Sequence, residues 1–203
     1  MYQFFIFNLY RVMEVDVQGL LIISSTLIFS YFAYNTYINS KLEKLTSTID
    51  NREYTVQVKE DAQGAANLIA TIRKKLVLLV EHLRKAYPRD PRTEMISVNF
   101  NPDRLKEGID NPEYTSYSVN KGEQIVLCLR NKDKLMDINT MMFVVLHEIA
   151  HLSTEDIGHT PEFWDNFKWI LLESMNIGIY TKQDFDKKSV EYCGMLISSS
   201  PLN

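Results

Sequence analysis

A five-residue pattern, His147-Glu148-Ile149-Ala150-His151, holds the residue types needed to bind a metal ion and to use it. On a helix, residues four apart lie on the same face, so both imidazoles can reach one cation. Glu148 can then face a water molecule instead of the metal, as in zinc hydrolases whose glutamate is the general base. The alternative is a buried helix with incidental histidines. Against it, three of the chain's four histidines fall between His147 and His159.

A third metal ligand is expected after this helix. His159 follows the pattern by eight residues, and Gly158 before it can turn the chain back. Glu173 is an alternative, because some zincins use a glutamate from the next helix, and Glu155 and Glu162 lie closer in sequence. We favour His159 because imidazole is the commonest metal ligand. Three protein ligands on zinc leave one position open for water.

Two helices are expected to position these ligands. The first runs from about Asp137 to Ser153, with Asp137 or Asn139 as its N-cap, because the segment is apolar and lacks Gly and Pro. The second begins near Pro161, a residue suited to a first helical turn. Its apolar face is expected to form core beneath the metal site and consists of Phe163, Trp164, Phe167, Ile170, Leu171 and Met175.

The stretch from Val145 to Trp164, VLHEIAHLSTEDIGHTPEFW, resembles the WLM/SprT-like zinc metallopeptidases. In that family an HExxH helix is followed by a short loop, a third histidine and a helix that opens with an aromatic pair. The wider stretch from about Tyr114 to Met195 is similar to the WLM-type proteins encoded by large DNA viruses. The resemblance implies that His147, His151 and His159 bind zinc. It also implies that Glu148 is the catalytic acid/base.

One spacing separates the chain from another class of zinc peptidases. The second and third histidines are eight residues apart, whereas the metzincin pattern HExxHxxGxxH places them about six apart. The metzincin class is therefore disfavoured, and neither Met175 nor Met195 is assigned to a Met-turn.

The rest of the domain predicts an α+β fold, a zincin-like domain with a small mixed sheet packed on helices. An amphipathic helix is expected to end before Pro88, and its apolar residues are Leu68, Ile69, Ile72, Leu76, Leu79 and Leu83. Strands are expected at Glu94–Asn101, Tyr114–Val119 and Gln124–Arg130, the last two joined by a turn over residues 120–123, and a final strand around Tyr192–Met195. Zincins bind extended peptide along an edge strand, and the resemblance points to Gln124–Leu129 for that role.

Other residues with chemical potential carry weaker expectations. Tyr192, Tyr114 or Tyr117 could donate a hydrogen bond to an oxyanion. His82 lies on a charged helix face, where we expect it to be solvated. For Cys128 and Cys193 we expect core or half-buried thiols, because neither has a partner at the CxxC spacing of zinc sites.

The composition limits the partners and the compartment. A net charge of −4 provides no general basic field, so binding of nucleic acid is not expected. Two widely separated cysteines provide no disulfide framework, which favours a reducing compartment.

The N-terminal part predicts a membrane anchor. Gly19–Ile38 is free of charge and long enough to cross a bilayer, with tyrosines clustered towards one end. We therefore expect an N-terminal segment (1–18, with Met1 or Met13 as the start), a transmembrane helix (19–38), a juxtamembrane helix or tether (39–58) and a metallopeptidase domain (59–203). Lys41, Lys44 and Arg52 follow the span, and by the positive-inside rule they place the domain in the cytoplasm or on the corresponding side of a virion membrane.

The function predicted from these features is that of a membrane-anchored zinc endopeptidase that cleaves peptide bonds with a zinc-activated water and Glu148 as general base. One alternative is a SprT-like protease for proteins crosslinked to DNA. Another is a structural membrane or virion protein that keeps the fold without turnover. The sequence defines neither the substrate nor the oligomeric state.

Overall fold

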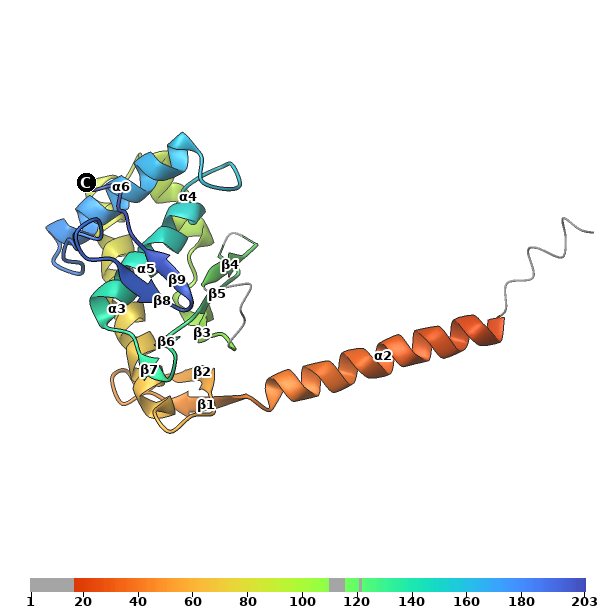
Figure 1. The fold of residues 1–203 in the computed structure, drawn as a ribbon. Helices are drawn as coiled ribbons and strands as arrows, with labels where there is room; N and C mark the ends of the chain where they lie inside the picture. Colours follow the sequence, from red (N-terminus) through yellow and green to blue (C-terminus); the bar gives the residue numbers. More distant parts are fainter. Residues whose placement is uncertain (1–16, 110–115, 121) are drawn as a thin grey trace, which may run out of the picture. The chain divides into compact units, whose positions relative to one another are not determined.

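The computed structural model describes residues 17–109, 116–120 and 122–203, and the chain forms two compact units, Met1–Lys41 and Leu42–Asn203. The described part of the first unit contains helix α2 (Val17–Asn39) (Figure 1). Almost all of the N-terminal segment 1–18 lies outside the described residues. The second unit contains, in chain order, β1 (Leu42–Thr46), β2 (Glu53–Gln57), α3 (Ala62–Ala86), α4 (Pro91–Asn99), η1 (Pro102–Arg104), β3 (Leu105–Glu107), β4 (Tyr117–Val119), β5 (Gln124–Leu127), β6 (Arg130–Asn131), β7 (Lys134–Leu135), α5 (Ile138–Leu152), α6 (Pro161–Asn176), β8 (Val190–Tyr192) and β9 (Met195–Ile197).

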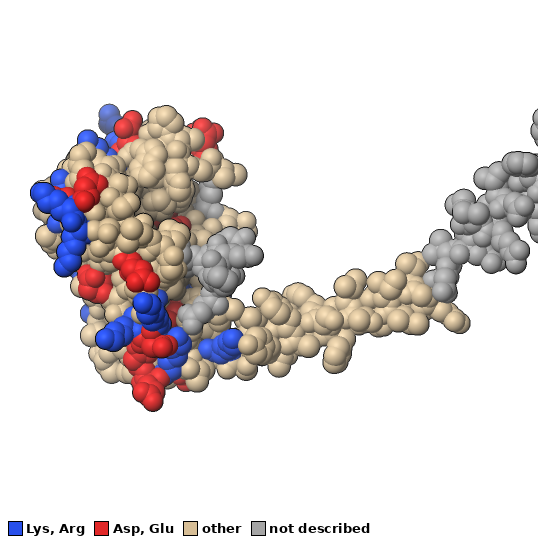
Figure 2. Space-filling view, in the orientation of Figure 1, with Lys and Arg blue, Asp and Glu red and all other residues tan. Residues whose placement is uncertain are grey.

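Helix α2 covers the segment predicted to span a membrane. The helix is long and apolar enough to do so. It is not buried, unlike the core helix of a soluble protein, but a signal sequence would share its length and composition. Figure 2 shows no charged side chain on it. Its hydroxyl groups donate to carbonyl groups of the preceding turn at 2.8 to 3.0 Å, which lowers the cost of placing them in apolar surroundings. These donors are Ser24, Ser25, Thr26 and Thr36.

Residues 42–57 form a β-hairpin, so the prediction of a juxtamembrane helix or tether over 39–58 is wrong. Strands β1 and β2 pair antiparallel from Leu42↔Gln57 to Thr46↔Glu53, and Asn51 has a positive φ of 57° in the turn. Tyr54 and Val56 of β2 are buried in the core. The strands contain few apolar residues, which is why their composition resembled that of a tether. The folded unit therefore begins at Leu42 instead of residue 59.

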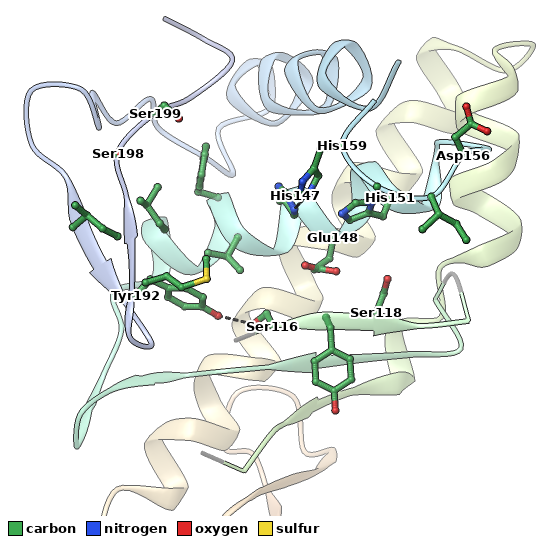
Figure 3. A pocket seen from close by; sticks show the side chains of 18 of the residues that line it. Ser116, Ser118, His147, Glu148, His151, Asp156, His159, Tyr192, Ser198 and Ser199 are labelled. Carbon is green, nitrogen blue, oxygen red and sulfur yellow. Dashed lines mark hydrogen bonds between the residues drawn. The ribbon is translucent and has the colours of Figure 1, made fainter. Parts of the chain in front are cut away.

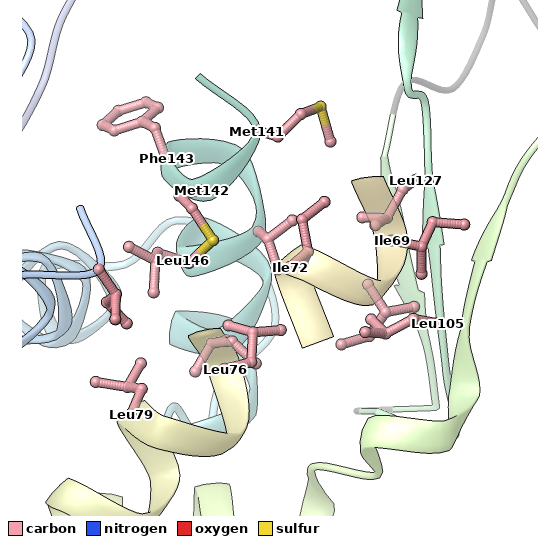
Figure 4. Packing of buried hydrophobic residues seen from close by; sticks show 14 of the residues in the cluster. Ile69, Ile72, Leu76, Leu79, Leu105, Leu127, Met141, Met142, Phe143 and Leu146 are labelled. Atoms are coloured by element: carbon pink, nitrogen blue, oxygen red, sulfur yellow. The ribbon is translucent and has the colours of Figure 1, made fainter. Parts of the chain in front are cut away.

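The core is built around helix α3. The predicted apolar stripe is buried except for Leu68, which is partly buried, and the helix ends at Ala86, before Pro88 as expected. Figure 4 shows Ile72 and Leu76 of α3 beside Met142 and Leu146 of α5, with Ile69 near Leu105 and Leu127 of the sheet. Full burial of one such side chain contributes about 1.5–3 kcal/mol. The core thereby fixes α5, the helix that carries the HExxH pattern, against the rest of the domain.

The segment predicted as a strand at Glu94–Asn101 is a helix. Helix α4 runs from Pro91 to Asn99, and the Asp90 side chain accepts a hydrogen bond from the Arg92 backbone N–H. Aspartate at the N-cap followed by proline at the first helical position is a strong start signal. That local signal outweighs the short run of apolar residues from which a strand was predicted.

The central sheet has three strands in the order β3-β5-β4. Strand β3 pairs with β5 in parallel, and β4 pairs with β5 antiparallel, which confirms the hairpin expected around residues 120–123. Strand β5 is therefore the middle strand, and the assignment of Gln124–Leu129 as the edge strand is wrong. In the sheet that the structure describes, β4 is the edge strand next to the HExxH helix.

A buried ion pair lies beneath this sheet. The Arg130 and Glu107 side chains are fully buried and bound to each other, and Arg130 Nη2 also donates to Asp61 Oδ1 at 2.6 Å. The second oxygen of Glu107 accepts from the Gln57 backbone N–H at 2.7 Å. These bonds join residues of β2, β3 and β6 to the N-terminal end of α3.

Cys128 and Cys193 form a disulfide, so the prediction of two thiols is wrong. Their Cα atoms are 6.4 Å apart although 65 residues separate them in sequence, a proximity that no local pattern could show. Cys193 lies in the turn of the β8–β9 hairpin, not in a strand as predicted. Cys193 and Gly194 have φ values of 48° and 82°, as in a type I′ turn. Because disulfides persist in oxidising surroundings, the bond also argues against a reducing compartment.

Candidate active site

Helix α5 presents the HExxH residues from a well-defined start. The Asp137 carboxylate accepts hydrogen bonds from the backbone N–H groups of Asn139 and Thr140 at 3.0 and 2.9 Å, so Asp137 is the N-cap. The helix ends at Leu152, one residue before the predicted end. His147 and His151 lie one turn apart on it, with ring centroids separated by 5.0 Å.

The loop after α5 returns His159 to the other two histidines. Asn166 of α6 is buried and donates to the Ser153 carbonyl at 2.8 Å, which holds the start of the loop. Gly158 turns the chain with a φ of 94°. The Thr160 hydroxyl then caps α6 by accepting from the Phe163 N–H, and α6 begins at Pro161, as predicted.

The three imidazoles converge in a manner that fits one metal ion. One ring nitrogen from each of His147, His151 and His159 lies within 4.8 Å of the others, and the Nε2 atoms of His147 and His159 are 3.0 Å apart. Two nitrogens on one tetrahedral zinc, each at about 2.0–2.1 Å, are separated by about 3.3 Å. The His147–His159 pair is thus close to the spacing that zinc requires, and the His151 nitrogen lies within 4.8 Å of both. Among the described residues, this group contains no carboxylate.

Burial keeps two of the three candidate ligands, His147 and His151, in the form that can bind a metal. Burial lowers the pKa of His147 to about 3, and the neighbouring His151 and His159 act in the same direction. Burial also lowers the pKa of His151 to about 4. Both rings are therefore neutral at physiological pH, and the neutral ring is the form that binds a metal.

Glu173, the alternative third ligand, is occupied elsewhere. Its carboxylate binds His82 Nε2 at 2.7 Å and accepts from the Tyr87 hydroxyl at 2.6 Å. Burial raises the pKa of Glu173, but the hydrogen bonds from Tyr87, His82 and Asn176, together with the charge interaction with His82, outweigh it, so the pKa is lowered. His82 is thus half-buried and paired, not simply solvated as expected.

Phe163 supports all three imidazoles. Its ring centroid lies 4.4 Å from that of His151, 4.7 Å from that of His159 and 4.9 Å from that of His147, and the side chain is fully buried. The expected core beneath the histidines is therefore present at this position. Trp164, which was predicted to belong to the same buried face, is instead exposed beside His159.

Glu148 faces an open cleft of about 800 Å³ next to the histidines (Figure 3). Burial raises the pKa of Glu148 to about 7, while hydrogen bonds from the backbone and side chain of Ser118 on β4 act in the opposite direction. A carboxyl group with a pKa near neutrality can both take up and release a proton. Sequence reasoning missed Ser118, because only the pairing of the strands brings β4 to this helix.

The tyrosines considered as oxyanion donors behave differently from one another. Tyr192 is buried, its hydroxyl donates to the Cys128 carbonyl at 2.9 Å, and it lies 2.5 Å from Ser116 Oγ, which accepts from the Cys128 N–H. The hydroxyl proton of Tyr192 is thus already donated to a backbone carbonyl, so it is not free to bind an oxyanion. Tyr117 lines the cleft from β4, and Tyr114 lies outside the described residues.

Comparisons with known proteins identify the family and the relatives of this chain. Residues 43–199 match the model of the WLM domain family. The chain is 30% identical over 192 residues to an uncharacterised protein, R325, of Acanthamoeba polyphaga mimivirus, covering 90% of this chain and 98% of that protein. It is 29% identical over 157 residues to an uncharacterised protein, 136R, of Invertebrate iridescent virus 6, covering 74% of this chain and 84% of that protein.

Among solved structures, the crystal structure of Wss1 from Saccharomyces cerevisiae is similar, with a TM-score of 0.46 and 23% identity, over 60% of this chain and 85% of that one. The match to the family model covers most of the chain, and the mimivirus relative aligns over nearly its whole length. The chain therefore belongs to the WLM domain family, with an α+β fold and relatives among large DNA viruses.

Proposed function

We propose that this protein is a zinc-dependent endopeptidase in which His147, His151 and His159 hold the metal and Glu148 is the general base. The observation that carries the proposal is the convergence of three histidine nitrogens within 4.8 Å at an open cleft, beside a buried glutamate. A structural zinc site is normally closed by four protein ligands, whereas a catalytic site keeps an open position. Membership of the WLM family supports the same chemistry.

In this proposal, the metal and three side chains have separate roles in hydrolysis. A bound zinc supplies Lewis acidity, which lowers the pKa of water and polarises the scissile carbonyl. Glu148 takes the proton from the attacking water and returns it to the leaving amine. Ser118 orients the Glu148 carboxylate through its two hydrogen bonds. Phe163 excludes water from beneath the three imidazoles, so that they keep one orientation.

Strand β4 is the element along which we expect the substrate to lie. It is one of the two edge strands of the described three-stranded sheet, and it is the one that touches Glu148, through Ser118. An extended peptide can add to such an edge through backbone hydrogen bonds, and its side chains then determine specificity. This role replaces the one predicted for Gln124–Leu129.

The decisive experiment compares the wild-type protein with Glu148→Gln. We expect both to bind about one zinc per chain, as in three-ligand catalytic sites, and only the wild type to cleave a denatured protein substrate. Zinc content is measured by mass spectrometry of the metal and cleavage by gel electrophoresis. Equal cleavage by the two proteins would refute the role of Glu148. Zinc binding without any cleavage by the wild type would favour the structural membrane protein.

Membrane attachment through α2 is part of the proposal. The helix has the required length and composition and is exposed along its length. Recovery of the full chain in membranes after alkaline extraction, with loss of α2 releasing it, would support an anchor. A mature protein that begins after α2 would instead identify a signal sequence.

The side of the membrane on which the domain lies can be tested separately. The charges of Lys41, Lys44 and Arg52 predict the cytoplasmic side, whereas the Cys128–Cys193 bond favours an oxidising compartment. We give more weight to the disulfide, because Lys44 and Arg52 belong to the folded hairpin and its turn. Labelling of free thiols in cells before lysis distinguishes the two, since a cytoplasmic domain would have two reactive cysteines.

A further inference from the structure

The cleft combines its polar centre with apolar side chains that are exposed to solvent. Ile157 is 93% exposed, the highest value among the large apolar side chains of the described residues, and it lines the cleft. Leu196, which is 63% exposed, lines it as well. Single exposed apolar residues are common on any surface. Four of them line this cleft, because Tyr117 and Met195 are exposed there as well, and beside the proposed general base they call for a ligand that covers them.

These two side chains come from different elements on either side of the histidines. Figure 3 shows Asp156, the neighbour of Ile157, at one end of the cleft, and Tyr192, Ser198 and Ser199 at the other end with the β8–β9 hairpin. His147, His151, His159 and Glu148 lie between the two ends. A peptide bond held at Glu148 would therefore have apolar side chains on both sides, with Ile157 at one end and Leu196, the more exposed of the hairpin's apolar residues, at the other.

Both contacts are held on constrained backbone. Ile157 lies in the loop between α5 and α6, which also carries His159 and whose start is held by the hydrogen bond from Asn166 to the Ser153 carbonyl. Leu196 belongs to β9 and pairs with Glu191 of β8. The disulfide at Cys193 ties that hairpin to the end of β5. Side chains held in this way can discriminate between substrates, because little order has to be created on binding.

The charges of the cleft favour polypeptide over nucleic acid. None of its described lining residues is Lys or Arg, while Glu148 and Asp156 are acidic. Nucleic-acid sites neutralise phosphates with basic side chains, and the part of the cleft lining that the structure describes contains none. An uncharged, extended segment of polypeptide fits better than a phosphate backbone.

We propose that the cleft selects extended polypeptide segments with a bulky apolar side chain on each side of the scissile bond, and that Ile157 and Leu196 provide the two apolar contacts. The inference rests on the proposed peptidase function and names its substrate class. Along an extended peptide, successive side chains point to opposite faces. A segment lying past Glu148 can therefore present one side chain to each contact while its backbone follows β4.

The test measures binding separately from cleavage. The full chain carrying Glu148→Gln is purified in mild detergent and loaded with zinc. Fluorescence anisotropy then compares two labelled peptides of Ser, Thr and Gln, one with a Leu on each side of the central bond and one with Ser at both places. Loss of an apolar contact in a binding pocket costs at least about tenfold in discrimination. We therefore expect the Leu peptide to bind at least about tenfold more tightly.

Two single substitutions in the cleft test which side chains cause the preference for the Leu peptide. Ile157→Ser and Leu196→Ser, each in the Glu148→Gln background, are expected to weaken binding of the Leu peptide by about tenfold and to leave the Ser peptide unchanged. Val98→Ser is the matched control, because Val98 is 78% exposed on α4 but does not line the cleft. Equal binding of the two peptides, or equal behaviour of all three variants, would overturn the inference.

Failure of this inference differs from failure of the proposed function. If the wild-type chain cleaves a mixture of peptides without preference for apolar residues, the peptidase stands and the assigned specificity is wrong. If the wild-type chain cleaves nothing but the Glu148→Gln chain still prefers the Leu peptide, the binding site stands and the catalytic proposal fails.

Discussion

Removal of the Cys128–Cys193 disulfide is expected to destabilise the folded unit strongly. The two cysteines are separated by 65 residues. In the chain-entropy description, a cross-link that closes a loop of this length lowers the entropy of the unfolded chain enough to stabilise the fold by about 4 kcal/mol. For a domain of this size, 1 kcal/mol corresponds to about 2–4 °C in Tm. Cys128→Ser combined with Cys193→Ser should therefore lower the Tm by about 8–16 °C.

The assay is thermal unfolding of the segment Leu42–Asn203, which contains the whole described core. Oxidised wild type, reduced wild type and the double serine variant are compared at one pH. The last two should coincide, because both lack the cross-link. The reasoning is refuted if oxidised wild type unfolds at the same temperature as the double variant while mass spectrometry shows its disulfide to be intact.

Four further predictions concern the metal ligands, the pH dependence and the supports of the site. His159→Ala should lose most of the bound zinc, whereas Glu173→Gln should keep it, and the zinc content of folded protein decides between the two candidate ligands. Tyr87→Phe should destabilise the fold at neutral pH, where Glu173 is ionised. The difference in the free energy of unfolding from wild type should vanish as the pH falls through the lowered pKa of Glu173. Urea unfolding at several pH values measures this difference, and a difference that does not change with pH would contradict the prediction. Glu107→Leu leaves Arg130 buried without its closest partner and should cost about 3–5 kcal/mol in chemical denaturation. The exposed Lys132–Glu191 pair is the control, and Lys132→Ala should cost no more than about 1 kcal/mol. Asp137→Ala should cost about 1–2 kcal/mol and Asp137→Asn much less, since asparagine also caps helices; equal losses in thermal unfolding would contradict the capping role.

The helices that carry the candidate site could be predicted because their signals are local. Asp137 starts α5, Pro161 starts α6, and Gly158 turns the chain between them. These residues act within a few positions of themselves, so the sequence alone placed His159 beside the HExxH helix. The same logic applies to α4, where Asp90 and Pro91 gave a start signal that the strand prediction overlooked.

Features that depend on distant residues could not be predicted. The order β3-β5-β4 puts a parallel and an antiparallel partner on either side of β5, and the sequence of β5 does not reveal which strand lies outside. The role of Ser118 follows from that order. Likewise, no residue near Cys128 in the sequence indicates that its Cα atom lies 6.4 Å from that of Cys193. Such contacts arise from the packing of the whole unit.

The origin of the cleft wall has a consequence for biosynthesis. The candidate metal ligands are complete at His159, but the hairpin that forms one end of the cleft spans Val190–Ile197. Domains generally fold as units as the chain leaves the ribosome. A nascent chain that has passed His159 but not Cys193 has its three imidazoles without the wall, the Tyr192 hydrogen bonds or the disulfide. Under the proposed function, the complete cleft would therefore become available to a substrate only after these later residues have been made.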